Sequence, residues 1–281
     1  MNVLRGGSVG NLYVVGTPIG NLEDISLRAL RILGEVDLIA AEDTRRTRKL
    51  LTHYEIKTPL TSYHEHNKLT KLDELVSTLR QKDVALVSEA GMPGLSDPGY
   101  EIIQAAIARG IPVTPVPGPS ALITALVVSG LPTDSFLYLG FLPRRQKQRR
   151  QLLASVARER RTLVTFEAPH RLRASLADLK DVLGDRRIAV ARELTKMHEE
   201  VWRGNIGQAL AHFEESPPRG EFTLIIEGAK GELVTWDEGQ VREALAELMA
   251  EGAERKEAVK AVADLAGWPK REVYKVALRE F

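Results

Sequence analysis

Four glycine- and proline-rich loops are the places in this sequence where ligand binding and chemistry are expected. Each follows a short apolar run with the character of a buried strand, and they are GTPIGN (16–21), AEDTRR (41–46), SEAGMPGLSDPG (88–99) and VPGPSA (116–121). In open α/β sheets, ligands bind beyond the carboxyl ends of the strands. Any one of these loops alone is better explained as a tight turn that needs glycine. The four together predict an α/β enzyme with a ligand-binding cleft.

The sequence lacks the patterns of several common sites. GTPIGN does not have the G-x-G-x-x-G spacing of a dinucleotide site, and no G-x-x-x-x-G-K-[ST] phosphate loop occurs. The chain has no cysteine, which excludes a disulfide, a thiolate zinc site and a cysteine nucleophile. His64 and His66 could share a metal on a strand, but no third ligand has a suitable spacing. We therefore expect loop histidines and no metal site.

A basic segment points to a polyanionic partner. The formal net charge of the chain is only +1, but residues 144–161 contain eight Lys/Arg and one acid, Glu159. Such a stripe on a nearly neutral protein favours phosphate contact at one place, and the alternative is a solvated helix. Arg45 and Arg46, at an expected helix start, have the same two interpretations.

An alternation of strands and helices is expected to hold these loops. Short apolar and β-branched runs predict eight strands, at 12–16, 37–40, 84–88, 112–116, 136–140, 162–167, 187–191 and 222–227. Amphipathic periodicity predicts helices between them, such as 67–81 behind Asn67 and 170–183 ending at Gly184. This alternation is typical of parallel-rich sheets covered by helices, so the predicted fold class is α/β.

The strands divide into two groups, and only helical periodicity follows Gly231. The predicted organisation is a flexible tail (1–10), two α/β domains (11–118 and 119–231) and a helical, helix-turn-helix-like extension (232–281). The longest apolar stretch, Ala121–Val128, is far too short to span a membrane, so we expect no membrane association and a cytoplasmic protein.

The loops and their flanks resemble a known family. Residues 12–26, 41–51, 88–99 and 116–126 are similar to motifs of the tetrapyrrole methylase superfamily. FEAPHR (166–171), ARELTK (191–196) and GEFTLIIEG (220–228) resemble later motifs of the branch that methylates ribose 2′-hydroxyls of small-subunit ribosomal RNA. The resemblance covers residues 11–231, and the helical tail is similar to the extension of that branch. Met92 stands in Gly-Met-Pro where tetrapyrrole-modifying relatives carry Gly-Asp-Pro. This difference weakens the hypothesis that the substrate is a porphyrin.

This resemblance implies two α/β domains with S-adenosylmethionine bound in the cleft between them, and a homodimer. It implies 2′-O-methylation of a cytidine in the decoding region of 16S rRNA, on the assembled small subunit. Two alternatives stay open. One is a methylase of a tetrapyrrole or another small molecule, and the other is a ribosome-assembly factor that binds RNA without turnover.

The resemblance also implies site residues. The expected cofactor pocket consists of Ile19, Met92, Leu95, Ser120, Ala121 and Thr223, although Ser120 also suits a helix N-cap. A ribose hydroxyl is a poor nucleophile until its proton leaves, so a carboxylate is useful. The catalytic candidates are Glu89, Asp97, Glu167 and Glu193. Glu89 is favoured because it directly follows a strand, and the alternative is a carboxylate that orders its loop. The RNA-binding candidates are Arg45, Arg46, Arg144, Arg145, Lys147, Arg149 and Arg150.

Overall fold

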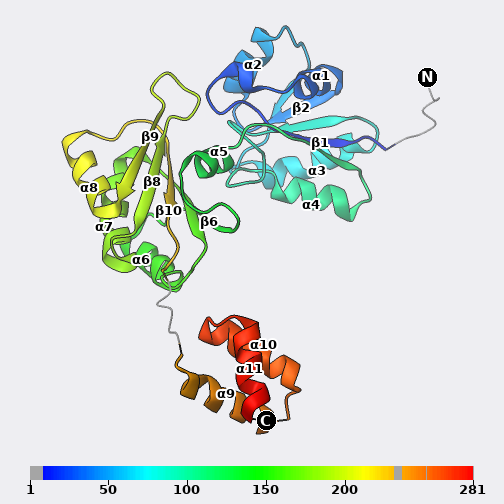
Figure 1. The fold of residues 1–281 in the computed structure, drawn as a ribbon. Coiled ribbons are helices and arrows are strands. Elements are labelled where there is room, and N and C mark those ends of the chain that lie inside the picture. The colour runs from blue at the N-terminus through cyan, green and yellow to red at the C-terminus, as the bar shows by residue number, and fades with distance from the viewer. Residues whose placement is uncertain (1–8, 231–235, 251, 281) are drawn as a thin grey trace. The chain divides into compact units, whose positions relative to one another are not determined.

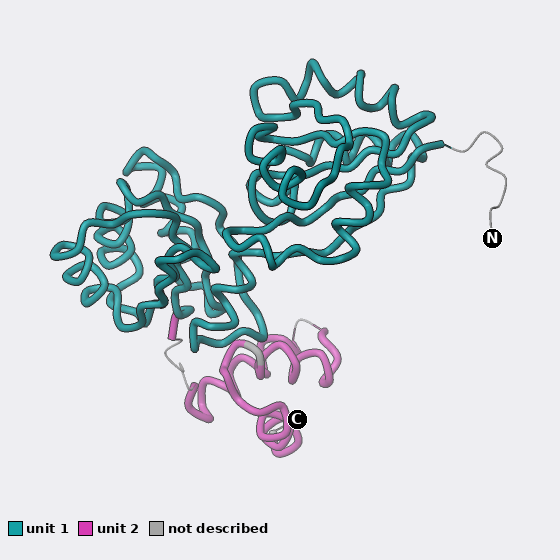
Figure 2. Tube along the Cα trace, turned by 90° about the horizontal axis from the view of Figure 1, so that it is seen from above, with its two compact units in different colours: residues 1–228 teal, residues 229–281 magenta. Residues whose placement is uncertain are grey.

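The computed structural model describes residues 9–230, 236–250 and 252–280, and the chain divides into two compact units (Figure 2). Unit 1 comprises residues 1–228 and unit 2 residues 229–281. Residues 1–8 of the predicted tail lie outside the described residues. Gly10 is buried and fixed in place, because its N–H donates to the Leu79 carbonyl at 2.9 Å. A side chain at Gly10 would meet the Lys82 carbonyl oxygen, with its Cβ 1.9 Å away.

The first half of unit 1 is a five-stranded parallel sheet, in the order β3-β2-β4-β1-β5. Its strands are β1 (Leu12–Val15), β2 (Leu38–Ala41), β3 (Leu60–Ser62), β4 (Val84–Val87) and β5 (Val113–Val116). Strands β1 and β2 are labelled in Figure 1. The helices of this half are α1 (Leu27–Glu35), α2 (Thr44–His53), α3 (Lys68–Leu79) and α4 (Tyr100–Ala108), with a 3-10 turn η1 (Leu22–Asp24). The parallel order brings the loops after β1, β2, β4 and β5 to the same edge of the sheet.

Both faces of this sheet are buried, which explains its continuous apolar strands. Successive strand residues point to opposite faces. Val15 and Val87 pack with α1 and α2, whereas Leu12 and Leu86 pack with α3 and α4. The predicted helix at 67–81 is α3, although the Asn67 side chain makes no capping bond within the helix and instead accepts from the His64 N–H at 2.7 Å.

The second half of unit 1 is a mixed sheet in the order β6-β7-β10-β8-β9. Its strands are β6 (Phe136–Phe141), β7 (Thr162–Glu167), β8 (Arg187–Arg192), β9 (Glu200–Asn205) and β10 (Phe222–Ile226). Only β6 and β7 pair in parallel, and the other three pairs are antiparallel. The prediction of parallel-rich sheets therefore holds for the first sheet and fails for the second. Alternation with helices does not by itself fix strand direction.

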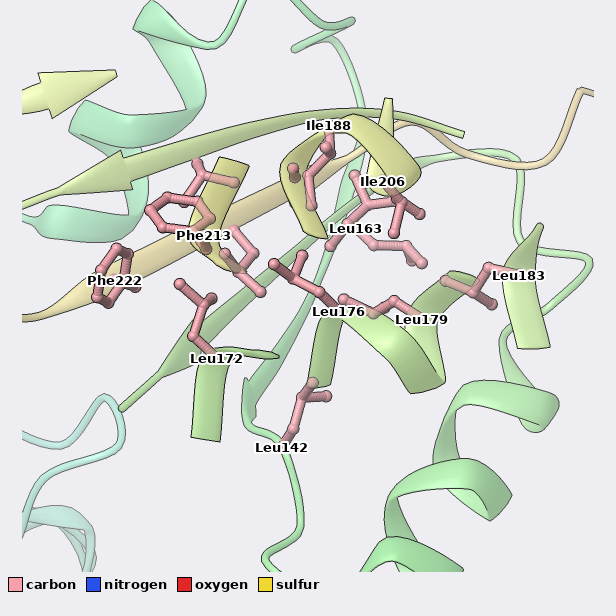
Figure 3. Close-up of a cluster of buried hydrophobic side chains, with 14 of the residues drawn as sticks. Leu142, Leu163, Leu172, Leu176, Leu179, Leu183, Ile188, Ile206, Phe213 and Phe222 are labelled. Carbon is pink, nitrogen blue, oxygen red and sulfur yellow. The ribbon is translucent and has the colours of Figure 1, made fainter. Parts of the chain in front are cut away.

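One face of the second sheet carries α6 (Gln146–Ser155), α7 (Leu172–Leu183), the turn η2 (Pro169–Arg171) and α8 (Ile206–Glu215). Their shared core includes Leu153, Leu176 and Phe213 (the last two labelled in Figure 3). The other face is covered by α5 (Ala121–Val128), and Ile19 from the first half packs into the same cluster. The two halves of unit 1 are thus joined by apolar packing next to the first of the four loops.

The sequence analysis did not predict two of the strands. β3 has three residues, and β9 has the polar sequence EVWRGN. Both lie at sheet edges, so their residues are only partly buried. Edge strands need no apolar run, and for that reason they leave little trace in a sequence.

Unit 2 is a three-helix module, as the sequence predicted. Its helices are α9 (Glu238–Ala250), α10 (Arg255–Ala266) and α11 (Lys270–Glu280), and they enclose a small core that includes Val241, Val262 and Val273. Gly267, between α10 and α11, has a φ of 66°, the left-handed conformation in which glycine ends helices. Among the described residues, none of the helices has the length and apolar character needed to cross a membrane.

Candidate functional site

A cavity of about 300 Å³ in unit 1 gathers the predicted site residues. It is lined by loops at the edge of the first sheet and by residues of the second. All six residues expected to bind the cofactor line this cavity, namely Ile19, Met92, Leu95, Ser120, Ala121 and Thr223. They come from four separate stretches of chain, so the fold assembles one apolar-walled pocket from segments far apart in sequence.

Backbone packing between three loops fixes one wall of this cavity. The Thr17 N–H donates to the Gly91 carbonyl at 2.9 Å, and the Gly91 N–H donates back to Thr17 at 3.0 Å. A Cβ on Gly16 would lie 2.7 Å from both the Gly118 Cα and the Met92 sulfur. Glycine is therefore required where these loops cross, and this crossing positions Met92.

Ser120 occupies the N-cap position of α5 but makes no capping hydrogen bond. Its backbone is extended, with a φ of −146° and a ψ of 114°. The alternative that Ser120 serves only as a cap is therefore not supported by a side-chain contact. Ser120 lines the cavity, and its hydroxyl, which makes no capping bond, can serve a polar ligand group.

Three carboxylates cluster beside the cavity: Glu42, Glu89 and Asp97. Burial, together with the neighbouring charges of Glu42 and Glu89, raises the pKa of Asp97 to about 7 against the opposing hydrogen bond from Ser88. Burial also raises the pKa of Glu42, whose carboxylate accepts from the Glu89 N–H at 3.1 Å. Asp97 is the catalytic candidate whose protonation changes near neutrality, which suits a general base.

Glu89, the favoured candidate in the sequence, has a different environment. Its carboxylate forms an ion pair with Arg46 of α2. Glu42 was not among the sequence candidates, although it directly follows β2 in AEDTRR, while Glu89 follows β4 after one intervening residue, Ser88. Position after a strand therefore identified Glu89 but not Glu42, and it favoured Glu89 over Asp97 because burial and neighbouring charge exist only in the folded protein.

Glu167 does not fit a catalytic role in this structure, because both of its oxygens are engaged. One oxygen accepts from the Ala168 N–H at 2.8 Å and pairs with Arg171 at 2.5 Å. The other accepts from the Ser175 hydroxyl at 2.5 Å. The buried carboxylate therefore holds the start of α7 against β7, the ordering role that a carboxylate in such a loop can also have.

Glu193 likewise orders its own loop. It adopts a φ of 48°, and its carboxylate accepts from Lys196 at 2.8 Å and from the Glu221 N–H at 2.9 Å. The same loop reaches the first half of the unit, where the Thr195 hydroxyl accepts from the Asn21 N–H at 3.1 Å. Glu193 thus helps to hold the two halves of the unit together at the cavity.

A second cavity of about 310 Å³ adjoins the first. The two share Ile19, Arg46, Glu89, Ala90 and Glu221 as lining residues. The second cavity has a more polar lining, with Lys49 and Lys196 as further cations and with the hydroxyls of Thr17, Thr47 and Ser88. A polar, partly cationic space beside an apolar pocket suits an acceptor that carries hydroxyls and phosphates.

The predicted basic cluster splits into exposed and buried members. Arg144, Arg145 and Lys147 are exposed at the start of α6. Arg149 is only 4% exposed and pairs with Asp178 at 2.6 Å. Its inclusion among the RNA-binding residues does not fit the structure, because a buried and paired guanidinium has no surface for a phosphate. Arg150 lies between Asp178 and Asp181, at 3.0 and 2.9 Å.

The sequence candidates included no aromatic residue, yet Phe141 and Phe166 line the first cavity. Their ring centroids are 5.5 Å apart, and Phe141 is 54% exposed. Tyr138 also contacts Phe166, with ring centroids 5.4 Å apart, and its hydroxyl lies 2.6 Å from the Ser96 hydroxyl. This hydrogen bond links β6 to the loop that carries Asp97. In the sequence, these rings are indistinguishable from ordinary strand residues.

Solved structures share this fold. The cobalt-precorrin-4 methyltransferase of cobalamin biosynthesis matches 80% of this chain and 98% of its own, with a TM-score of 0.62 and 14% identity. The uroporphyrin-III C-methyltransferase from Thermus thermophilus, in its native form, matches 78% and 97%, with a TM-score of 0.56 and 20% identity. At these identities the likeness shows a common fold alone.

Relatives found by sequence comparison have a much higher identity to this chain. A Halalkalibacterium halodurans protein named ribosomal RNA small subunit methyltransferase I is 49% identical over 276 residues, which make up 96% of each chain. A Thermotoga maritima protein of the same name is 51% identical over 221 residues, 78% of this chain and 99% of its own. The model of the tetrapyrrole (corrin/porphyrin) methylases matches residues 11–210. The chain therefore belongs to the tetrapyrrole methylase family, and its close relatives carry the name of small-subunit ribosomal RNA methyltransferases.

Proposed function

We propose that this protein transfers the methyl group of S-adenosylmethionine to the 2′-hydroxyl of a cytidine in the decoding region of 16S rRNA, within the small ribosomal subunit. The observation that carries the proposal is the 49% identity, over 96% of both chains, to a protein named ribosomal RNA small subunit methyltransferase I. The later motifs in β7, β8 and β10 support the ribose-methylating branch. The homodimer implied by the resemblance and the cytoplasmic location expected from the sequence stay predictions.

The residues around the first cavity fit S-adenosylmethionine, the methyl donor of this family. Ile19, Met92, Leu95 and Ala121 supply apolar walls of the kind that adenine and a thioether need, and Ser120 and Thr223 add hydroxyls. Asp97 lines the same cavity and offers a negative charge to a sulfonium ion. The cofactor supplies an electrophilic methyl group, and the protein has to align it with the acceptor.

The second cavity supports the acceptor half of the proposal. A ribose placed at the wall that the two cavities share would lie beside Arg46 and Glu89, and Asp97, a charge neighbour of Glu89, lines the first cavity. The ribose oxygen then forms a bond to the methyl carbon while the carbon–sulfur bond breaks, and Asp97 accepts the hydroxyl proton. Direct displacement depends mainly on alignment of the three atoms, and proton removal adds a further rate gain.

The test of the reaction compares three acceptors under one set of conditions. Tritium from labelled S-adenosylmethionine is expected to enter 30S subunits that lack the modification, with less in free rRNA and none in a porphyrin. Nuclease mapping should then place the label on a ribose in the decoding region. Label in the porphyrin would favour a small-molecule methylase, and binding to 30S without any transfer would favour an assembly factor.

A matched pair of variants tests the cofactor pocket. Ser120→Trp should fill the first cavity and abolish S-adenosylmethionine binding in calorimetry, because an indole has no room between the walls at α5. Ser155→Trp, at an exposed position at the end of α6, is the control and should bind normally. Normal binding by Ser120→Trp would show that the cofactor lies elsewhere.

A further inference from the structure

Unit 2 carries a groove whose lining is strongly basic. The groove has a volume of about 600 Å³, and five of its seven lining residues are Lys or Arg while none is acidic. We call it the basic groove and define it by Arg255, Lys256, Lys260, Lys270, Arg271 and Tyr274. None of these residues was among the sequence candidates, because they are spread over two helices.

The concentration of positive charge is not explained by the composition of the unit. Residues 229–281 contain nine Lys/Arg and eleven Asp/Glu, so the unit as a whole is slightly acidic. Among the described residues, the side chains of Lys256, Lys260 and Lys270 make no ion pair or hydrogen bond, whereas Lys275 on α11 pairs with Glu272 at 2.8 Å. Gathering unpaired cations in one place costs stability, so this arrangement points to an anionic partner.

The geometry of the two helices adds to this charge. α10 begins at Arg255 and α11 at Lys270, so the first turns of both helices border the groove. The positive ends of the two helix dipoles favour anions at the same place as the side chains. The short turn at Gly267–Pro269 holds α10 and α11 as a helix-turn-helix pair.

Tyr274 indicates which class of anionic partner the groove fits. It follows Lys270 by one helical turn, lines the groove and is 45% exposed. An exposed ring among cations suits a nucleic acid, because bases stack on aromatic faces while phosphates pair with Lys and Arg. An acidic protein segment would use the cations but would gain little from the ring.

We propose that the basic groove of unit 2 binds the phosphate backbone of the RNA substrate, with Tyr274 as a stacking surface for an adjacent base. The proposal rests on an RNA substrate, as the proposed function does, and assigns a second contact site outside the methyl-transfer site. The Thermotoga maritima relative supports this separation. It matches over 221 residues that make up 99% of its length, about the size of unit 1 alone.

The test uses the full-length protein without cofactor, so that binding is measured apart from methyl transfer. The groove variant is Lys256→Gln with Lys270→Gln, and the control is Lys275→Gln with Arg279→Gln, which removes the same charge from α11 outside the groove. Fluorescence anisotropy with a labelled single-stranded RNA and sedimentation with 30S subunits give the affinities. Thermal denaturation checks that both variants are folded.

The groove variant should bind RNA roughly 10- to 30-fold more weakly at 0.15 M salt, with a log–log salt slope reduced by about 0.7 to 0.9 per lost contact. The control should bind like the wild type. Tyr274→Ala should cost about 5-fold or more, and Tyr274→Phe should restore binding, since only the ring is needed.

Two results would overturn the proposal. One is equal affinity and equal salt slope for the groove and control variants. The other is displacement of the RNA by polyglutamate at equal charge concentration, together with no effect of Tyr274→Ala, which would assign the groove to an acidic protein. Failure of the proposed function would give a different result from failure of the groove proposal. The wild type would then bind 30S subunits without transferring label, while the groove variant would still bind more weakly.

Discussion

At the scale of single residues, the environment decides what each carboxylate can do. Glu167 is saturated by Arg171, Ser175 and a backbone N–H, and Glu89 is paired with Arg46. Asp97 is left at the cavity with a pKa of about 7. The sequence identified these acids by their positions in loops, but burial and pairing exist only after folding.

Activity should depend on Asp97 and on pH. If Asp97 accepts the proton, kcat/KM should rise with pH to a plateau, with a midpoint near 7 set by burial and by the charges of Glu42 and Glu89. Asp97→Asn should lower the rate by roughly 10²- to 10⁴-fold and remove this dependence. Single-turnover methylation of 30S subunits across pH 5.5 to 9 measures both effects.

Stability provides the control for this variant. The folded pKa of Asp97 lies above its ordinary value, so between about pH 4 and 7 the folded state keeps a proton that the unfolded state has lost. That contribution to stability is therefore lost as the pH rises through this window. Asp97→Asn should be at least as stable as the wild type at pH 8. A variant that is less active because it is less stable would point to a structural role.

At the scale of elements, α6 combines a buried ion pair with an exposed basic start. Burial alone would raise the pKa of Asp178, but hydrogen bonds from Arg149, Gln146 and Arg150 outweigh it and hold the pKa below its ordinary value. The pair ties α6 to α7 beneath the exposed residues. The sequence showed one basic run, and helical geometry divides it between the interior and the surface.

Arg149→Ala should destabilise the protein by about 3–5 kcal/mol at pH 7, because it leaves the buried Asp178 carboxylate without its main partner. Arg144→Ala, at an exposed position, should change stability by less than about 0.5 kcal/mol. The stability from Asp178 is present above its unfolded pKa and is lost as the pH falls through the lower folded pKa. The gap between the two variants in urea denaturation should therefore narrow in strong acid.

The exposed residues at the start of α6 are the part of the cluster suited to phosphate contact. Replacing Arg144, Arg145 and Lys147 together with Gln should raise the KM for 30S subunits and reduce the salt slope by roughly 0.7 to 0.9 per lost contact. Cofactor affinity and the identity of the methylated nucleotide should not change, because phosphate contacts position a substrate and do not specify it. Unchanged KM and salt dependence would mean that these residues only solvate the helix.

At the scale of the whole molecule, unit 1 and unit 2 have separate cores. A chain ending at residue 230 should fold, bind S-adenosylmethionine with unchanged affinity in calorimetry, and bind 30S subunits more weakly. Loss of cofactor binding in this truncated chain would show that the methyl-transfer site needs unit 2. Equal 30S affinity would remove its role in substrate binding.

The sequence was sufficient for the fold class, eight of the strands and the three C-terminal helices, because buried strands and amphipathic helices have clear periodicities. It was insufficient for the edge strands β3 and β9 and for strand direction in the second sheet, because these depend on partners distant in the chain. For the site, the resemblance supplied six residues that line one cavity. It could not supply Phe141 at this cavity, Lys196 at the adjoining one or Glu42 beside Asp97, because these placements follow only from the packing.

The crossing of Gly16 and Gly118 and the paired backbone bonds between Thr17 and Gly91 have an evolutionary consequence. This wall of the cavity is shaped by main-chain atoms, which every residue possesses. Substitutions around it can therefore accumulate without moving it, provided that the glycines remain. Side chains of the adjoining second cavity can then change and admit new methyl acceptors. The wall of the first cavity, where the methyl donor is expected to bind, keeps its shape.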